Sequence, residues 1–147
     1  MSFFDYNRNM LEIRRQHYLD SLSRFAQTPN IVAVVGLRRV GKSVLLRQFA
    51  DGVRRSEQVS YVDKESFDFA EVKTAADLVG YVNATTRKGE PRLVVVDEVQ
   101  QIEQWQTAIA SLNAEPSTRV AISGSNASLF SGELATRIAG RYLTLQV

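Results

Sequence analysis

Short apolar segments recur along the chain, separated by stretches in which apolar residues return at helical spacing. The runs IVAVV and LVVV contain no alternating polar residue, as expected for strands buried on both faces of a parallel sheet. The predicted strands cover residues 31–35, 58–62, 93–96, 120–122 and 142–147. The predicted helices cover residues 9–26, 42–50, 74–85, 102–112 and 129–138. Strands that alternate with helices predict an α/β domain with a mostly parallel sheet.

Glycine and proline mark the boundaries of these elements. Pro29 is expected to end the first helix near Thr28, because the residue before a proline is pushed out of helical geometry. Gly52 is the expected stop of the second helix. We therefore predict an N-terminal helical segment over residues 1–28, packed on a core formed by residues 29–147.

The composition is that of one globular domain. The chain has 147 residues, of which 44% are hydrophobic and 23% charged, so a sizeable core is expected and disorder is not. The absence of cysteine excludes disulfides and thiolate metal sites. No segment approaches the ~18 apolar residues of a membrane span, and the N-terminus lacks the apolar stretch of a signal peptide. These features predict a soluble, cytoplasmic protein with no membrane partner.

The charge pattern gives little support to nucleic-acid binding. The net charge is +2, and the basic residues occur in pairs scattered along the sequence. A nucleic-acid partner usually requires a concentrated basic face. Solvated surface is the favoured interpretation of most of these pairs, and nucleic acid stays a partner without support.

Residues 36–43, GLRRVGKS, match the phosphate-binding pattern G-x-x-x-x-G-K-[ST] at every position. A polyphosphate requires several backbone N–H donors close together, and glycines at both ends of the loop permit that path. The following helix directs its N-terminal N–H groups at the anion. Lys42 supplies charge to the β- and γ-phosphates, and the Ser43 hydroxyl ligates Mg²⁺. The predicted nucleotide-binding residues are Gly36, Arg38, Arg39, Val40, Gly41, Lys42, Ser43 and Val44.

A second element, LVVVDE, is an apolar strand that ends in two carboxylates. Asp97 is expected to hold Mg²⁺, largely through water, because Mg²⁺ keeps much of its hydration shell. Glu98 is expected to orient and polarise the attacking water. Such a pattern alone can be a strand end that turns to solvent. A phosphate loop at the same sheet edge favours the functional interpretation.

A third polar cluster, SGSN, ends the fourth predicted strand. Ser125 is the preferred side chain for contact with the γ-phosphate or the attacking water, with Ser123 and Asn126 as alternatives. A helix cap explains the same residue types equally well, and both interpretations stay open. Further along, Arg137 or Arg141 is a candidate arginine finger for a neighbouring subunit, although a surface arginine is the favoured interpretation.

With these elements in order, the sequence resembles the AAA+ type of P-loop ATPase. The resemblance rests on residues 36–43 with their double arginine, on residues 93–100 followed by Trp105, and on residues 122–142. The last of these, ISGSNASLFSGELATRIAGRY, is the most family-specific stretch. The sequence looks closest to a prokaryotic AAA-domain family whose members usually carry a C-terminal domain of unknown function.

The resemblance implies a fold, a nucleotide and a set of roles. The fold is the three-layer sandwich of P-loop NTPases, with a five-stranded sheet in the order 5-1-4-3-2. The nucleotide is ATP with Mg²⁺, Glu98 is the catalytic base, and the cluster after the fourth strand senses the γ-phosphate. Relatives continue into a helical lid and a C-terminal domain. This chain is therefore expected to be the ATPase core alone, with weak turnover, and its partners are expected to be that missing domain and like subunits.

Three functions remain in competition. The leading hypothesis is an ATPase that hydrolyses ATP to ADP and phosphate and drives conformational change in an attached domain or partner. The second is a non-hydrolysing, nucleotide-dependent switch or scaffold. The third is another P-loop enzyme, a GTPase or a kinase. No guanine-reading N-K-x-D tetrapeptide occurs, and an adjacent Asp–Glu pair favours hydrolysis over kinase chemistry, which requires that water be excluded.

Overall fold

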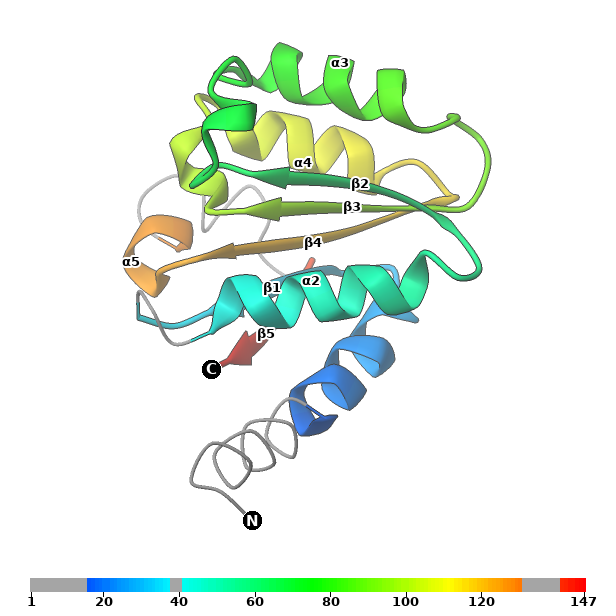
Figure 1. Cartoon of the computed structure of the whole chain (residues 1–147), viewed down its shortest axis with the longest axis vertical. Helices are drawn as coiled ribbons and strands as arrows, with labels where there is room; N and C mark the ends of the chain where they lie inside the picture. The colour runs from blue at the N-terminus through cyan, green and yellow to red at the C-terminus, as the bar shows by residue number, and fades with distance from the viewer. Residues whose placement is uncertain (1–15, 38–40, 131–140) are drawn as a thin grey trace, which may run out of the picture.

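The computed structural model in Figure 1 describes residues 16–37, 41–130 and 141–147, in which helices and strands alternate. The strands are β1 (Ile31–Val35), β2 (Gln58–Asp63), β3 (Arg92–Asp97), β4 (Thr118–Gly124) and β5 (Tyr142–Gln146). The helical elements are residues 16–26, α2 (Lys42–Val53), α3 (Ala75–Thr85), α4 (Trp105–Asn113) and α5 (Asn126–Leu129), with 3₁₀ turns η1 (Phe67–Phe69) and η2 (Val99–Gln101). The predicted α/β class is confirmed.

The five strands form one sheet in the order β2-β3-β4-β1-β5, and every described pairing is parallel. Read from the other edge, this is the predicted order 5-1-4-3-2. Strand β4 lies between β1 and β3. Because all strands run in one direction, the turns that follow these three strands emerge side by side at the carboxyl edge of the sheet.

Helices cover both faces of this sheet and make a three-layer sandwich (Figure 1). Helices α3 and α4 pack on one face, where Val94 and Val96 of β3 belong to the core cluster. Helix α2 and residues 16–26 pack on the other face, where Leu93 and Val95 are buried with Leu22. Alternate residues of β3 thus enter different cores. That arrangement explains why the strand reads as an uninterrupted apolar run.

Several boundaries differ from the predicted ones. Helix α2 continues through Gly52 to Val53, so that glycine lies within the last turn and does not stop the helix. Helix α4 begins at Trp105 rather than at residue 102, because Val99–Gln101 form the 3₁₀ turn η2 and Gln104, in a left-handed conformation, is the N-cap. Trp105 is 3% exposed and belongs to the core cluster.

The last predicted helix also starts earlier than expected, at Asn126 rather than at residue 129. The Ser125 hydroxyl accepts a hydrogen bond from the backbone N–H of Ser128 at 3.1 Å, which is the geometry of a helix N-cap. The remainder of that predicted helix, residues 131–138, lies outside the described residues, as do residues 9–15 of the first one.

Arg92 opens β3, one residue before the predicted start of the strand, and its side chain is fully buried. Its guanidinium donates to hydroxyls of Thr118 at 2.9 Å and Thr86 at 3.1 Å, and to the Asn83 side-chain oxygen at 3.0 Å. It also pairs with the carboxylate of Glu115. A buried charge is tolerated where its donors are satisfied in this way. This network secures the edge of the sheet opposite to the turns after β1, β3 and β4.

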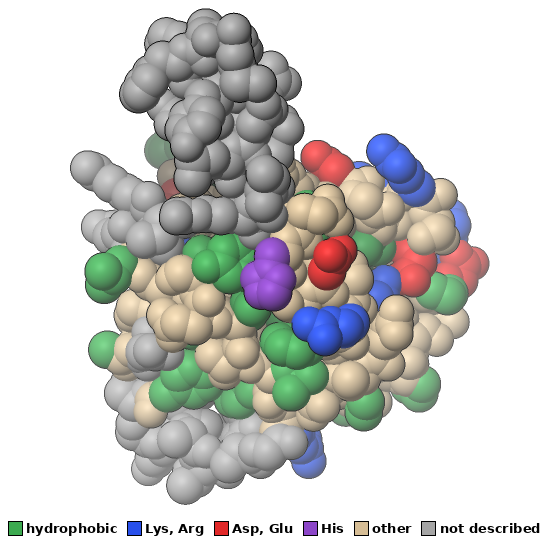
Figure 2. All heavy atoms as spheres, turned by 90° about the horizontal axis from the view of Figure 1, so that it is seen from below, with side chains coloured by type: hydrophobic (Ala, Val, Ile, Leu, Met, Phe, Trp, Pro, Cys, Tyr) green, Lys and Arg blue, Asp and Glu red, His purple; other side chains and the backbone are tan. Residues whose placement is uncertain are grey.

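The surface visible in Figure 2 carries charges of both signs, and its basic side chains do not gather into one patch. His17 is exposed on this face, with its ring centroid 6.0 Å from that of Tyr18. Within the described ranges, no helix is long and apolar enough to cross a membrane.

Candidate active site

The three predicted polar clusters meet at the carboxyl edge of the sheet. Val35 at the end of β1 is in register with Gly124, and Val96 of β3 is in register with Ile122. The glycine loop therefore leaves the sheet beside the end of β4. On the other side of β4, Asp97 stands beside Ser123.

The glycine loop links β1 to α2 across this edge. Gly41 has a φ of +89°, a backbone conformation that glycine adopts at little cost. Helix α2 begins at the next residue, so its first N–H groups face the carboxyl edge of the sheet. Val44 lies in the first turn and is 41% exposed. Arg38, Arg39 and Val40 lie outside the described residues, and their contribution stays a prediction.

Lys42 is buried within this loop, with 4% of its surface exposed. Its Nζ donates a hydrogen bond to the carbonyl oxygen of Gly36 at 2.8 Å and lies 3.6 Å from Oε1 of Glu98. A buried ammonium group requires an anion or several acceptors close by. In this structure Glu98 provides the negative charge, so the lysine of the loop and the second carboxylate of the Asp–Glu pair are directly joined.

Asp97 has no exposed surface, and its two oxygens differ in their contacts. The Ser123 hydroxyl donates a hydrogen bond to Oδ1, whereas Oδ2 has no hydrogen-bond partner of ordinary length in the described part of the chain. Burial raises the pKa of Asp97, and the hydroxyls of Ser123 and Ser43 only partly offset that effect. A buried carboxylate oxygen without a donor, beside the Ser43 hydroxyl, is suited to a cation.

Glu98 adopts a left-handed backbone conformation, with φ 56° and ψ 53°. A residue that carries a Cβ atom occupies this region at a cost of about 1–2 kcal/mol. The backbone N–H of Glu98 donates to the Ser123 hydroxyl at 2.9 Å, and that contact fixes the turn. The turn directs the carboxylate toward Lys42 instead of along β3. Backbone strain of this kind is concentrated at functional sites.

The structure joins Ser123, an alternative candidate of the sequence, to the Asp–Glu pair and gives Ser125 the contacts of a helix cap. Ser123 is fully buried and bridges Asp97 and Glu98, whereas Ser125 was the preferred site residue. The Ser125 hydroxyl bonds to the side chain and backbone of Ser128, as a helix cap does. Extending the β3–β4 register by one residue places Ser123 beside Asp97, a pairing that local sequence patterns do not contain.

Hydrogen bonds between polar groups outside the three motifs join β2 to α2. Asp63 is in register with Asp97 and accepts hydrogen bonds from Arg47 at 2.7 Å and from the backbone of Glu65 at 2.9 Å. The Tyr61 hydroxyl donates to the carbonyl of Ser43 at 3.5 Å. These residues belong to no motif, and the sequence analysis missed them. The only sequence signal for this group was Arg47, which lies one helical turn after Ser43 and therefore on the same face of α2.

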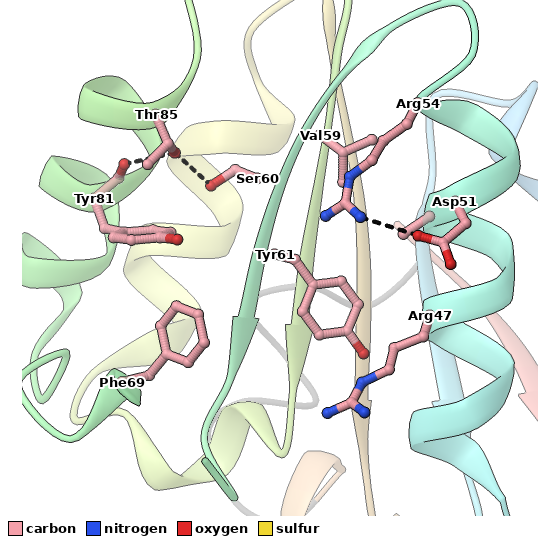
Figure 3. Close-up of a pocket in the computed structure, with 10 residues that line it drawn as sticks. Arg47, Asp51, Arg54, Val59, Ser60, Tyr61, Phe69, Tyr81 and Thr85 are labelled. Atoms are coloured by element: carbon pink, nitrogen blue, oxygen red, sulfur yellow. Dashed lines mark hydrogen bonds and ion pairs between the residues drawn. The ribbon is translucent and has the colours of Figure 1, made fainter. Parts of the chain in front are cut away.

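A groove of about 380 Å³ runs beside strand β2, between α2 and α3. Figure 3 shows Arg47 and Tyr61 on its α2 side and Phe69 and Tyr81 on its α3 side. None of the predicted site residues lines it. The groove is therefore separate from the cluster at the carboxyl edge.

Of the two candidate arginine fingers, Arg137 lies outside the described residues and Arg141 lies at the amino end of β5. The Arg141 carbonyl accepts a hydrogen bond from the backbone N–H of Ile31 at 2.7 Å. The five residues of β1 separate this point from the loop, a length of about 16 Å. Arg141 therefore starts at the edge of the sheet opposite to the loop of its own chain.

A parallel sheet in this order, with a glycine loop leading into a helix and a buried Asp–Glu pair at its carboxyl edge, defines the P-loop nucleoside-triphosphatase fold. Residues 28–147 match the family described as AAA domain. The chain belongs to this family and is an AAA+ P-loop ATPase domain, as the sequence resemblance predicted.

Known proteins share this sequence and fold to different degrees. An uncharacterized protein of Haemophilus influenzae is 37% identical over 140 residues, covering 92% of this chain and 35% of that protein. Cdc6p of Pyrobaculum aerophilum aligns with a TM-score of 0.60 at 13% identity, over 90% of this chain and 44% of that one. A DNA polymerase III gamma subunit-related protein of Thermotoga maritima aligns with a TM-score of 0.61 at 15% identity, over 88% and 45%. The chain thus spans about a third of its sequence relative and under half of these structures.

Proposed function

We propose that this domain binds ATP with Mg²⁺ and hydrolyses it to ADP and phosphate, and that hydrolysis drives conformational change in an attached domain or partner. One observation carries the proposal: Glu98 of the buried Asp97–Glu98 pair lies 3.6 Å from the ammonium of buried Lys42, at the edge where the glycine loop ends. Negative and positive groups held together out of water fit the positioning and charge neutralisation that phosphoryl transfer requires.

The phosphates would be bound by the loop backbone, the first N–H groups of α2 and the Lys42 ammonium. Mg²⁺ would be held by the Ser43 hydroxyl and by Asp97, whose Oδ2 has no other described partner of ordinary length. The described residues contain no cluster of three histidines or acidic residues that could hold a metal on their own. Mg²⁺ usually takes its remaining ligands from water and substrate phosphates, and it would neutralise charge on the β- and γ-phosphates.

Glu98 is the proposed base. It accepts a proton from the attacking water as the water oxygen bonds to the γ-phosphorus and the bond to the leaving ADP oxygen breaks. For this step the contact between Glu98 and Lys42 has to break. The Glu98 carboxylate then binds the attacking water, and the Lys42 ammonium binds phosphate. Ser123 supports the arrangement by bridging the backbone of Glu98 and the carboxylate of Asp97. Direct contact of Ser125 with the γ-phosphate stays a prediction.

The test compares two charge-removing variants with exposed matched controls. Lys42→Ala is expected to lose binding of Mg·ATP, and Glu98→Gln is expected to keep binding while phosphate release falls at least 10²-fold. Lys88→Ala and Glu90→Gln make the same changes at side chains that are 68% and 53% exposed, and both should behave like the parent. Phosphate release by Glu98→Gln at the parental rate would refute the base assignment.

A nucleotide-dependent switch is the second candidate, and the Lys42–Glu98 pair favours it. A base held by the lysine of the loop does not act on water until that contact opens. If the parent chain binds Mg·ATP tightly and releases phosphate no faster than Lys42→Ala, the switch is the better account.

The attached domain and the like subunits are also proposals. The chain covers 35% of the Haemophilus relative, so the rest of that protein is where a mechanical partner would lie. One of the structural neighbours is a DNA polymerase III gamma subunit-related protein. At 13–15% identity, however, these neighbours support the fold alone, and we propose no nucleic-acid contact. A cytoplasmic location stays the expectation from the sequence.

A further inference from the structure

Gln100 is joined to the proposed base although no motif role was assigned to it. It lies in η2, where its Nε2 donates a hydrogen bond to Oε2 of Glu98 while Lys42 lies 3.6 Å from the other oxygen. The orientation of the amide follows from its chemistry. An amide oxygen turned toward the carboxylate would place two acceptors together with no proton between them.

Gly124 makes room for this side chain. A Cβ atom at Gly124 would lie 2.7 Å from Oε1 of Gln100 and 2.9 Å from Cδ2 of Leu129, closer than real contacts allow. The backbone of Gly124 does not have a positive φ, so space rather than conformation accounts for the glycine. The Gln100 amide thus lies over the carboxyl end of β4, between the proposed base and the strand that leads into the loop.

Oε1 of Gln100 is buried and has no hydrogen-bond partner among the described residues. A buried amide oxygen without a donor is costly, and in native proteins such an atom calls for a specific explanation. Here Oε1 belongs to the same amide whose Nε2 donates a hydrogen bond to Glu98. A donor that arrives only with the substrates would account for it.

We infer that Gln100 completes the site of the attacking water, an inference that rests on the proposed ATP hydrolysis. Its Nε2 fixes the Glu98 carboxylate, and its Oε1 accepts a hydrogen bond from one O–H of the water while Glu98 accepts from the other. With both protons engaged, a lone pair of the water faces the γ-phosphorus. The new bond forms from water oxygen to phosphorus, the bond to the bridging oxygen breaks with its electrons on ADP, and the proton passes to Glu98.

The test uses Gln100→Met, which keeps the length of the side chain and removes both hydrogen-bonding groups. Loss of a positioned water predicts a fall in kcat of roughly 10²-fold, with KM and the Kd for Mg·ATP within about twofold of the parent. Gln101→Met makes the same change on the exposed side of the same turn and should leave kcat unchanged. Thermal melts establish that each variant is folded.

Gly124→Ala provides a second route to the same residue, because the added methyl displaces the amide without changing it. It should lower kcat in the parent and lower it much less in a Gln100→Ala background, where only the close approach to Leu129 remains. A packing role alone would give additive losses. Parental kcat in Gln100→Met, or additive effects of Gly124→Ala, overturns the inference while leaving ATP hydrolysis intact. Phosphate release by the parent no faster than by Lys42→Ala refutes the proposed function, and this inference with it.

Discussion

Replacing Asp97 with asparagine should make the isolated domain more stable while it removes a ligand of the proposed Mg²⁺ site. Asp97 is fully buried, its pKa is raised chiefly by burial, and Oδ2 lacks a partner of ordinary length. A carboxyl group whose pKa is raised in the folded state opposes folding at neutral pH, because the unfolded state carries its charge more readily. An unsatisfied buried acceptor costs about 1–3 kcal/mol. Asparagine keeps an oxygen for Ser123, removes the charge and places an amide N–H beside the Ser43 hydroxyl, which can accept it, so we expect a gain of about that size.

The assay is thermal and urea unfolding at pH 7 with EDTA and without nucleotide. For a domain of this size, each kcal/mol gained in the free energy of unfolding raises Tm by roughly 2–4 °C. Asp63→Asn is the matched control. The Asp63 carboxylate accepts from Arg47 and from the backbone of Glu65, so the same substitution should lower stability there. An Asp97→Asn protein that is no more stable than the parent would refute the account of an uncompensated buried charge.

Three further predictions concern residues outside the site. Arg92→Met should lower the free energy of unfolding by about 3–5 kcal/mol in urea, because it leaves part of a buried network unpaired, and a loss below 1 kcal/mol would contradict this. Burial alone would raise the pKa of Glu115, but hydrogen bonds from Arg92 and Thr118 lower it overall. Its contribution to stability is therefore present above pH 4.5 and lost as pH falls through the lower folded pKa. Acid unfolding should be less steep in Glu115→Gln, and an unchanged profile would count against the pairing. Gln104 has a φ of 55° at the start of α4, so Gln104→Gly should gain about 1 kcal/mol, and a loss would argue against strain there.

The strands were predictable because both faces of the sheet are covered. Residues such as Val94 and Val95 enter opposite cores, so burial on both sides appears in the sequence as an unbroken apolar run. The loop was predictable for a different reason. Its glycines and lysine are required by the phosphates themselves, and the pattern is therefore local.

Features that depend on contact between distant segments were not predictable. Ser123 rather than Ser125 lies beside Asp97 because of the β3–β4 register, which local propensity does not contain. Gln100 reaches the end of β4 only because Gly124 lacks a side chain, and the glycine appeared in the sequence as one member of a polar turn.

The predicted helix ends were inaccurate for a related reason. Gly52 has the propensity of a stop signal, yet α2 packs through Phe49 and Ala50 against the sheet and continues to Val53. Tertiary packing of the apolar face outweighs the cost of one glycine in a helix, about 1 kcal/mol. The left-handed turn at Glu98 likewise carries no sequence signal, because hydrogen bonding to Ser123 sustains it.

The central claim is that Glu98 activates the water that attacks the γ-phosphate of ATP bound by the loop. A single-turnover experiment, with the protein in excess over radiolabelled Mg·ATP, tests it most directly. The account predicts that the parent converts bound ATP to ADP and phosphate, whereas Glu98→Gln retains the ATP with at least a 10²-fold slower conversion and an unchanged Kd. Equal conversion rates in the two proteins would contradict the account, because the carboxylate that Lys42 now holds would then have no part in the chemistry.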